Sequence, residues 1–172
     1  MTKRFRDTKP RLKGWDYSHP GLYFITLVSY GQQCLFGKIQ SEQMIYSPLG
    51  EIVKHEWLRS FDLRDELFCH GWVIMPNHLH AIVRLSLVNT EKSEITNPGV
   101  AYRPPRSISS FVAGFKSSVT VRINQYRNTP KAPVWQERFH DHIIRDEAGY
   151  QEILKYIENN PRNWNDDRFH CR

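Results

Sequence analysis

The chain has few cysteines and no long apolar run, and these two absences exclude several classes of protein. Its 172 residues include three cysteines, Cys34, Cys69 and Cys171, which are too few and too scattered for a disulfide framework or a paired structural zinc site. No segment approaches the roughly 18 apolar residues that a membrane span needs. A secretory signal needs an apolar segment after its basic start, and none follows the basic N-terminus here. We therefore expect a soluble protein in the reducing cytoplasm, with no membrane partner.

Positive charge exceeds negative charge along this chain. Lys and Arg number 24 against 18 Asp and Glu, which gives a formal net charge of +6. Such an excess favours a polyanionic partner, above all nucleic acid, and hence a nucleoid-associated location. Much of it lies in a basic arm at residues 1–18. The arm is either a solvated tail or a phosphate-binding segment, and the two interpretations are compatible.

The remaining sequence indicates one α+β domain. Apolar residues make up 40% of the chain and aromatic residues 13%, enough for a single core at this length. The predicted elements are strand 22–28, a hairpin at 38–46, helix 47–60, strands 67–75 and 78–85, helix 107–127, a strand around 142–145 and helix 146–160. This order predicts a ferredoxin-like split βαβ sandwich, with an antiparallel sheet, helices on one face and a further C-terminal helix. We assign 19–165 to the domain and 166–172 to a short tail.

Two histidines one residue apart form the most informative motif. His78 and His80 lie inside an apolar, β-branched run, so on a strand both imidazoles point to the same face. Two neutral imidazoles side by side are half of a divalent-metal site. A lone strand histidine is more often a structural residue, but two buried polar rings on one apolar face need a partner. We therefore predict that both bind a metal.

The predicted last helix supplies a candidate nucleophile and a candidate third ligand. At roughly 100° per residue, its apolar stripe consists of Tyr150, Ile153, Leu154 and Ile157, which we place in the core. Tyr156 and Asn160 lie together on the flank of that stripe, four residues apart. A phenol is a weak nucleophile unless its target is activated, as a cation does by polarising a phosphoryl oxygen. Two histidines and an amide oxygen, with open positions, favour Mg²⁺ or Mn²⁺ over structural zinc.

Three motifs in one order carry a family resemblance. Met-Pro-Asn-His-Leu-His at 75–80 is followed by His-Ile-Ile-Arg at 142–145 and Tyr-Ile-Glu-Asn-Asn-Pro at 156–161. Together they resemble the single-tyrosine transposases of the HUH superfamily, in the branch associated with repetitive extragenic palindromes of bacteria. The resemblance spans roughly residues 15–164. It implies that residues 19–165 form a transposase-like catalytic domain.

The resemblance also implies an activity, a metal and a substrate. It implies a metal-dependent transposase or nickase that cleaves and rejoins single-stranded DNA next to a hairpin. Tyr156 would form a 5′-phosphotyrosine link and free a 3′-hydroxyl. His78, His80 and Asn160 would bind the metal, Mg²⁺ or Mn²⁺. The partner would be single-stranded DNA with hairpin or palindromic repeats, bound by a monomer or a homodimer.

Several cations and two further histidines are candidates for contacting that DNA. The cations lie in the basic arm, at the end of the 86–106 loop and on the long predicted helix: Lys3, Arg4, Arg6, Arg11, Lys13, Arg103, Arg106, Lys116 and Arg122. His140 and His142 repeat the His-x-His spacing. We interpret them as strand-edge or DNA-contacting residues rather than ligands.

Three other functions compete with this interpretation. A histidine-triad nucleotide hydrolase needs a third histidine where this chain has Ile82. A metal-dependent amidohydrolase needs a (β/α) barrel of about 250 residues, longer than this chain. The non-enzyme alternative is a domesticated protein that binds hairpin DNA without strand transfer. The presence of all four site residues, His78, His80, Tyr156 and Asn160, argues against that alternative.

Overall fold

The molecule is built on one four-stranded antiparallel sheet. The computed structural model describes residues 18–86 and 106–170. The sheet has the order β4-β5-β1-β6, with β1 at Gly21–Val28, β4 at Leu67–Met75, β5 at His78–Leu85 and β6 at His140–Ile144. The helices are α1 (Pro48–Asp62), α2 (Ile108–Tyr126) and α3 (Glu147–Asn159), and β2 (Gly37–Gln40) with β3 (Gln43–Tyr46) forms a separate hairpin. This topology confirms the predicted ferredoxin-like α+β fold.

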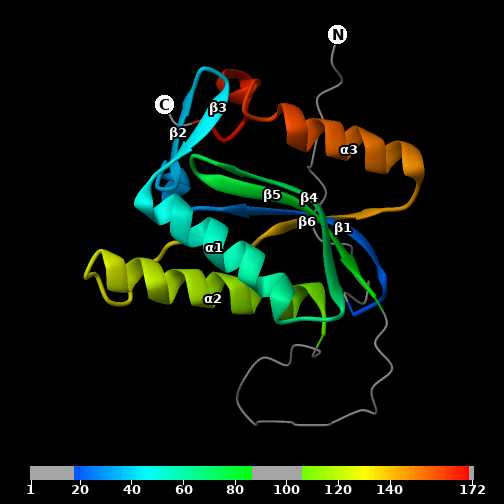
Figure 1. Cartoon of the computed structure of the whole chain (residues 1–172), viewed down its shortest axis with the longest axis horizontal. Helices are drawn as coiled ribbons and strands as arrows, with labels where there is room; N and C mark the ends of the chain where they lie inside the picture. The colour runs from blue at the N-terminus through cyan, green and yellow to red at the C-terminus, as the bar shows by residue number, and fades with distance from the viewer. Residues whose placement is uncertain (1–17, 87–105, 171–172) are drawn as a thin grey trace.

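The helices divide between the two faces of the sheet. Helices α1 and α2 cover one face, and α3 lies alone against the other (Figure 1). Leu79, Ala81 and Val83 of β5 belong to the main core cluster, which also contains residues of α1 and α2. The predicted alternation along β5 is thereby confirmed, because the intervening Ile82 belongs to a second cluster. The histidines alternate in the same way, so they face α3.

Helix α3 is held close to the sheet by a small apolar cluster. Ile153 and Ile157 of α3 pack with Phe24, Ile82 and Ile144 of the sheet. A Cβ at Gly71 of β4 would lie 2.7 Å from Leu154 Cδ1, so a larger residue there would force the Leu154 side chain to shift. Tyr150 is half-buried at the edge of the cluster and stacks edge-on against His70, with ring centroids 5.9 Å apart. Its predicted place in the core is therefore correct only in part.

Capping residues fix the helix starts where the sequence predicted them. Ser47 accepts a hydrogen bond from the Gly50 amide at 3.1 Å, with proline at the next position, and Asp146 accepts one from the Gly149 amide at 2.7 Å. Both satisfy amides that a helix N-terminus leaves unpaired. One prediction needs correction. Strand β6 begins at His140 rather than near His142, because the backbone pairing with β1 extends to Thr26.

Two further findings concern the helices and the cysteines. Within the described residues, no helix combines the length and apolar character needed to cross a membrane. Cys69 carries a free thiol, whereas Cys34 is disulfide-bonded. The scattered spacing of three cysteines does not predict that bond, because disulfide pairing depends on proximity in space rather than in sequence.

A buried carboxylate joins α1 to α2 on the face away from α3. Glu56 is only 3% exposed, accepts a hydrogen bond from Ser118 of α2 and lies 2.7 Å from the Nε of Arg122. Burial raises the pKa of Glu56, but the hydrogen bonds from Ser118 and His55 and the charges of Arg122 and Arg59 outweigh it. The pKa therefore lies below the usual glutamate value.

This lowered pKa gives a testable dependence of stability on pH. Because Glu56 ionises more readily in the folded state, its contribution is complete above about pH 4.5 and is lost as the pH falls below that value. We expect Glu56→Gln to lower the free energy of unfolding by about 1–3 kcal/mol at pH 7, and by less at pH 3. Urea unfolding of both proteins at several pH values measures this. An equal difference at pH 7 and pH 3 would contradict the assignment.

Candidate active site

Two imidazoles of β5 form the floor of the candidate site. His78 is 0% and His80 2% exposed, and their ring centroids lie 4.5 Å apart. Both point to the α3 face, as the alternation along the strand requires. Burial of two polar rings in one place is costly unless each nitrogen has a partner. The partners of the four ring nitrogens therefore indicate what the site binds.

The partners of Asn77 determine the tautomer of His78. The Asn77 carboxamide nitrogen donates to two carbonyls, those of Gln32 at 3.0 Å and Phe169 at 2.6 Å. The carboxamide oxygen is therefore the atom 2.8 Å from His78 Nδ1, and an oxygen only accepts. His78 Nδ1 must carry the proton and donate it. Its Nε2 then has a bare lone pair.

His80 is oriented in a similar way. Its Nδ1 lies 2.8 Å from the buried hydroxyl of Thr26 on β1, directly across the strand pairing. Its Nε2 lies 3.2 Å from the Tyr156 hydroxyl. When Nδ1 donates to Thr26, the phenol donates to Nε2. The tyrosine and the histidines thus meet within one chain.

Two acceptor atoms of the site lack a donor. His78 Nε2 and Asn160 Oδ1 are both buried, and neither has a hydrogen-bond partner within residues 18–86 and 106–170. Asn160 follows the last residue of α3 and is 2% exposed. Its side chain acts to raise the pKa of His78, against the effect of burial, so the two groups are neighbours. Buried nitrogen and oxygen atoms that lie close together and receive no hydrogen bond are typical ligands of a cation.

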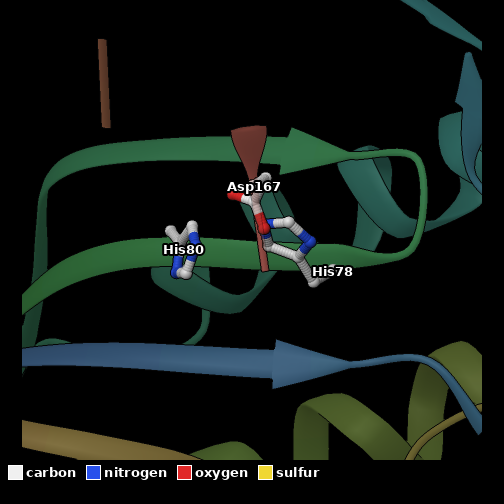
Figure 2. A group of neighbouring side chains, drawn as sticks. All are labelled: His78, His80 and Asp167. Atoms are coloured by element: carbon white, nitrogen blue, oxygen red, sulfur yellow. The ribbon is translucent and has the colours of Figure 1, made fainter. Parts of the chain in front are cut away.

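Asp167 is a site residue that the sequence analysis missed. One ligand atom from each of His78, His80 and Asp167 lies within 4.8 Å of the others, close to the roughly 4.2 Å across a cation with 2.1 Å bonds. Figure 2 shows the carboxylate against the His78 ring, with His80 beside it on β5. Asp167 follows the short 3₁₀ helix Trp164–Asp166, in a segment with no periodic pattern. The sequence offers no signal that would place it here.

The protonation of these groups fits a cation site. Burial and the nearby charge of Arg168 lower the pKa of His78 to about 3. Burial and the charges of His78, Arg168 and His140 lower the pKa of His80 well below its usual value. Both rings are therefore neutral at pH 7, the form that binds metals. Burial raises the pKa of Asp167, opposed chiefly by a hydrogen bond from the Phe169 amide and by the charge of Arg168.

These observations support a divalent cation at this place. The donor set consists of two imidazole nitrogens, one amide oxygen and one carboxylate oxygen, from His78, His80, Asn160 and Asp167. Ligand atoms of His78, His80 and Asp167 lie within 4.8 Å of one another, and the Nδ1 of each imidazole is held by a neighbour that fixes the ring. The cluster is compatible with a divalent metal, and mixed nitrogen and oxygen ligands suit Mn²⁺ and Mg²⁺ among others.

Those predicted DNA contacts that fall within residues 18–86 and 106–170 are not part of this cluster. Lys3, Arg4, Arg6, Arg11, Lys13 and Arg103 lie outside the described residues. Lys116 donates to the carbonyls of Gln136 and Glu137, and Arg122 pairs with Glu56 of α1. Both cations therefore already have partners within the protein. Arg106 is exposed just before α2. Helix α2 covers the face opposite α3 (Figure 1).

The two histidines of β6 lie beside the site rather than in it. His140 pairs with Thr26 and His142 with Phe24 across the β1–β6 ladder. They therefore share the sheet face of His80, one strand beyond Thr26. Both are exposed, and neither joins the ligand cluster within the described residues. Their prediction as DNA-contacting edge residues stays a prediction.

Known proteins resemble this chain in sequence and in fold. An uncharacterized protein of Haemophilus influenzae is 36% identical over 165 residues, which cover 93% of this chain and 91% of that protein. A solved structure of a REP-associated tyrosine transposase bound to a REP hairpin matches with a TM-score of 0.60 and 20% identity, over 87% of this chain and 71% of the other. No protein-family model matches the chain. At the level of fold, the resemblance predicted from the motifs is confirmed.

Proposed function

We propose that this chain, which belongs to the same family as the Haemophilus influenzae protein, is a single-tyrosine DNA strand transferase of the HUH type. One observation carries the proposal. The Tyr156 hydroxyl lies 3.2 Å from His80 Nε2, next to the orphaned acceptors of His78 and Asn160. A nucleophile beside a set of cation ligands is the arrangement that phosphodiester cleavage needs. The fold shared with a hairpin-bound transposase supports it.

The proposed step exchanges one phosphodiester bond for another. Tyr156 Oη attacks the phosphorus, a bond forms between them, and the bond from phosphorus to the 3′-oxygen breaks. The phenol proton passes to water, and the departing 3′-oxygen takes a proton from water. The product is a 5′-phosphotyrosine and a free 3′-hydroxyl, which attacks the phosphotyrosine when the strand is rejoined. The energy of the broken bond is kept in the covalent link.

Each site residue has a stated part in that step. We propose that His78, His80, Asn160 and Asp167 hold one Mg²⁺ or Mn²⁺, which when bound polarises the phosphoryl oxygen and stabilises its developing charge. Thr26 and Asn77 hold the imidazoles with Nε2 directed toward that place. Phe24 packs edge-on against Tyr156, with ring centroids 6.2 Å apart. This contact fixes the phenol in the position for attack.

We propose single-stranded DNA beside a hairpin as the substrate. One solved structure that matches this fold is bound to a REP hairpin, and the chain has a net charge of +6, which favours binding to phosphates. Of the nine cations named from the sequence, we propose Arg106 and the six outside the described residues as the hairpin contacts, since Lys116 and Arg122 are held by Gln136, Glu137 and Glu56. A nucleoid-associated location follows from such binding. A domesticated protein that binds hairpins without cutting is the alternative.

A labelled oligonucleotide distinguishes these functions. The probe is a single strand with a palindrome taken from beside the gene, labelled at its 3′ end and incubated with the protein and Mg²⁺ or Mn²⁺. The 5′-phosphotyrosine keeps the DNA on the 3′ side of the break, so the label should migrate with denatured protein. A retarded native complex without any denaturation-resistant adduct would favour the hairpin-binding alternative.

Replacing Asn160 tests the assignment of its amide oxygen. We expect Asn160→Ala to slow adduct formation by about 100-fold, because the cation loses one ligand. Asn159→Ala is the matched control, since the neighbouring amide donates to the Lys155 carbonyl at 2.8 Å and should change the rate less than about twofold. Thermal unfolding checks that both variants fold. Normal cleavage by Asn160→Ala together with lost cleavage by His142→Ala would mean that His142 is the ligand.

A further inference from the structure

We propose that Asn77 is a positioning residue that joins the two parts of the ligand set, the β5 histidines and the C-terminal segment that carries Asp167. This inference rests on the metal site proposed above. It assigns a role to a residue that the sequence analysis named only within the motif at 75–80. Asn77 is 0% exposed and lies in the connection between β4 and β5.

The contacts of Asn77 reach both parts at once. Its oxygen accepts from His78 Nδ1 at 2.8 Å, and its nitrogen donates to the Phe169 carbonyl at 2.6 Å. Phe169 follows Asp167 by two residues, and its amide donates to the Asp167 carboxylate at 2.7 Å. A short chain of hydrogen bonds therefore runs from one ligand to another through a single carboxamide. A shift at either end moves the other.

Ring packing secures the same segment over the histidines. The Phe169 ring lies 4.8 Å from the His78 ring and 6.4 Å from the His80 ring, between centroids, and Trp164 lies 6.0 Å from His78. Both aromatic side chains are buried. These ring contacts hold the segment near the site, but they do not orient its backbone carbonyls and amides. The Asn77 amide supplies that direction, because it sets the position of the Phe169 carbonyl and hence of the adjoining carboxylate.

Thr26 provides an internal comparison. Its hydroxyl does for His80 what the Asn77 oxygen does for His78, at the same 2.8 Å. Thr26 lies on β1, where its cross-strand neighbours are His80 and His140, and so belongs to the sheet alone. Loss of either group leaves one imidazole without its orienting partner. Only the loss of Asn77 should also release Asp167.

The experiment measures Mn²⁺ binding to the purified full chain by electron paramagnetic resonance. We expect Thr26→Val, which keeps the shape and removes the hydroxyl, to weaken Mn²⁺ binding by about 10-fold, and Asn77→Ala by about 100-fold. Thr26→Ser keeps the hydroxyl and should bind like the wild type. In the Asn77→Ala background, adding Asp167→Ala should cost much less than it does alone, because the carboxylate is already displaced.

Hydrogen exchange of residues 164–170 without metal gives a second readout. Exchange should increase in Asn77→Ala and stay unchanged in Thr26→Val, and it reports the link even where binding is weak. Equal loss of Mn²⁺ affinity in the two variants, additive effects of Asn77→Ala and Asp167→Ala, or unchanged exchange in Asn77→Ala would overturn this inference alone. Failure of the wild type to bind Mn²⁺ would overturn the metal site and this inference together.

Discussion

Replacing Tyr156 by phenylalanine should reduce formation of the covalent DNA adduct to background, a fall of more than about 10⁴-fold. The variant loses one oxygen atom, the only atom of the residue that can attack phosphorus. The ring and its edge-on contact with Phe24 remain, so folding and DNA binding should be preserved. The measurement is the fraction of 3′-labelled oligonucleotide that migrates with denatured protein.

Tyr150→Phe is the matched control for this experiment. Tyr150 lies on the same helix, and its hydroxyl is 3.5 Å from His70 Nδ1 at the far edge of the α3 face, away from the ligand cluster. Its loss should leave adduct formation within about twofold. Adduct formation by Tyr156→Phe at the wild-type rate would show that another group is the nucleophile. Loss of activity in both variants would indicate damage to α3 instead.

Removing His78 should cause the largest loss of metal binding. His78→Ala deletes the imidazole whose buried Nε2 has no other partner in the described part of the chain. The cation therefore loses one of its ligands. We expect Mn²⁺ affinity to fall by more than about 100-fold and adduct formation to fall with it. Titration calorimetry with Mn²⁺ measures the first effect directly.

His70→Ala serves as the control for the metal measurement. His70 lies on β4 and contacts Tyr150. Its replacement therefore removes one imidazole from the protein but none from the cluster of His78, His80 and Asp167. It should leave Mn²⁺ affinity unchanged. Unaltered affinity in His78→Ala would place the cation elsewhere. The proposal that Tyr156 acts beside the His78 and His80 pair would then lose its physical basis.

The side-chain directions that were predicted correctly are those set by a local period. The two-residue repeat of β5 placed His78 and His80 on one face, and the 3.6-residue repeat of α3 placed Tyr156 beside Asn160. Capping residues such as Ser47 and Asp146 marked where helices begin. Each inference needs only the sequence within one element. The order of such elements was enough to identify the fold.

The residues that the sequence did not reveal are joined by pairing between distant segments. Thr26 reaches His80 across 54 positions, and Asn77 reaches Phe169 across 92. Asp167 lies in an irregular segment with no pattern to mark its direction. The start of β6 was misplaced for a related reason, since His140 belongs to the strand only through its pairing with Thr26. Side chains that orient ligands become visible only when the fold is known.

The most direct test of the central claim is to locate the covalent nucleotide on the protein. Trypsin cleaves after Arg145, Lys155 and Arg162, so Tyr150 and Tyr156 fall in separate peptides, 146–155 and 156–162, each with a single tyrosine. After reaction with the hairpin oligonucleotide and nuclease digestion, mass spectrometry should find the added nucleotide phosphate on peptide 156–162. A nucleotide on any other peptide, or on none, would contradict attack by Tyr156.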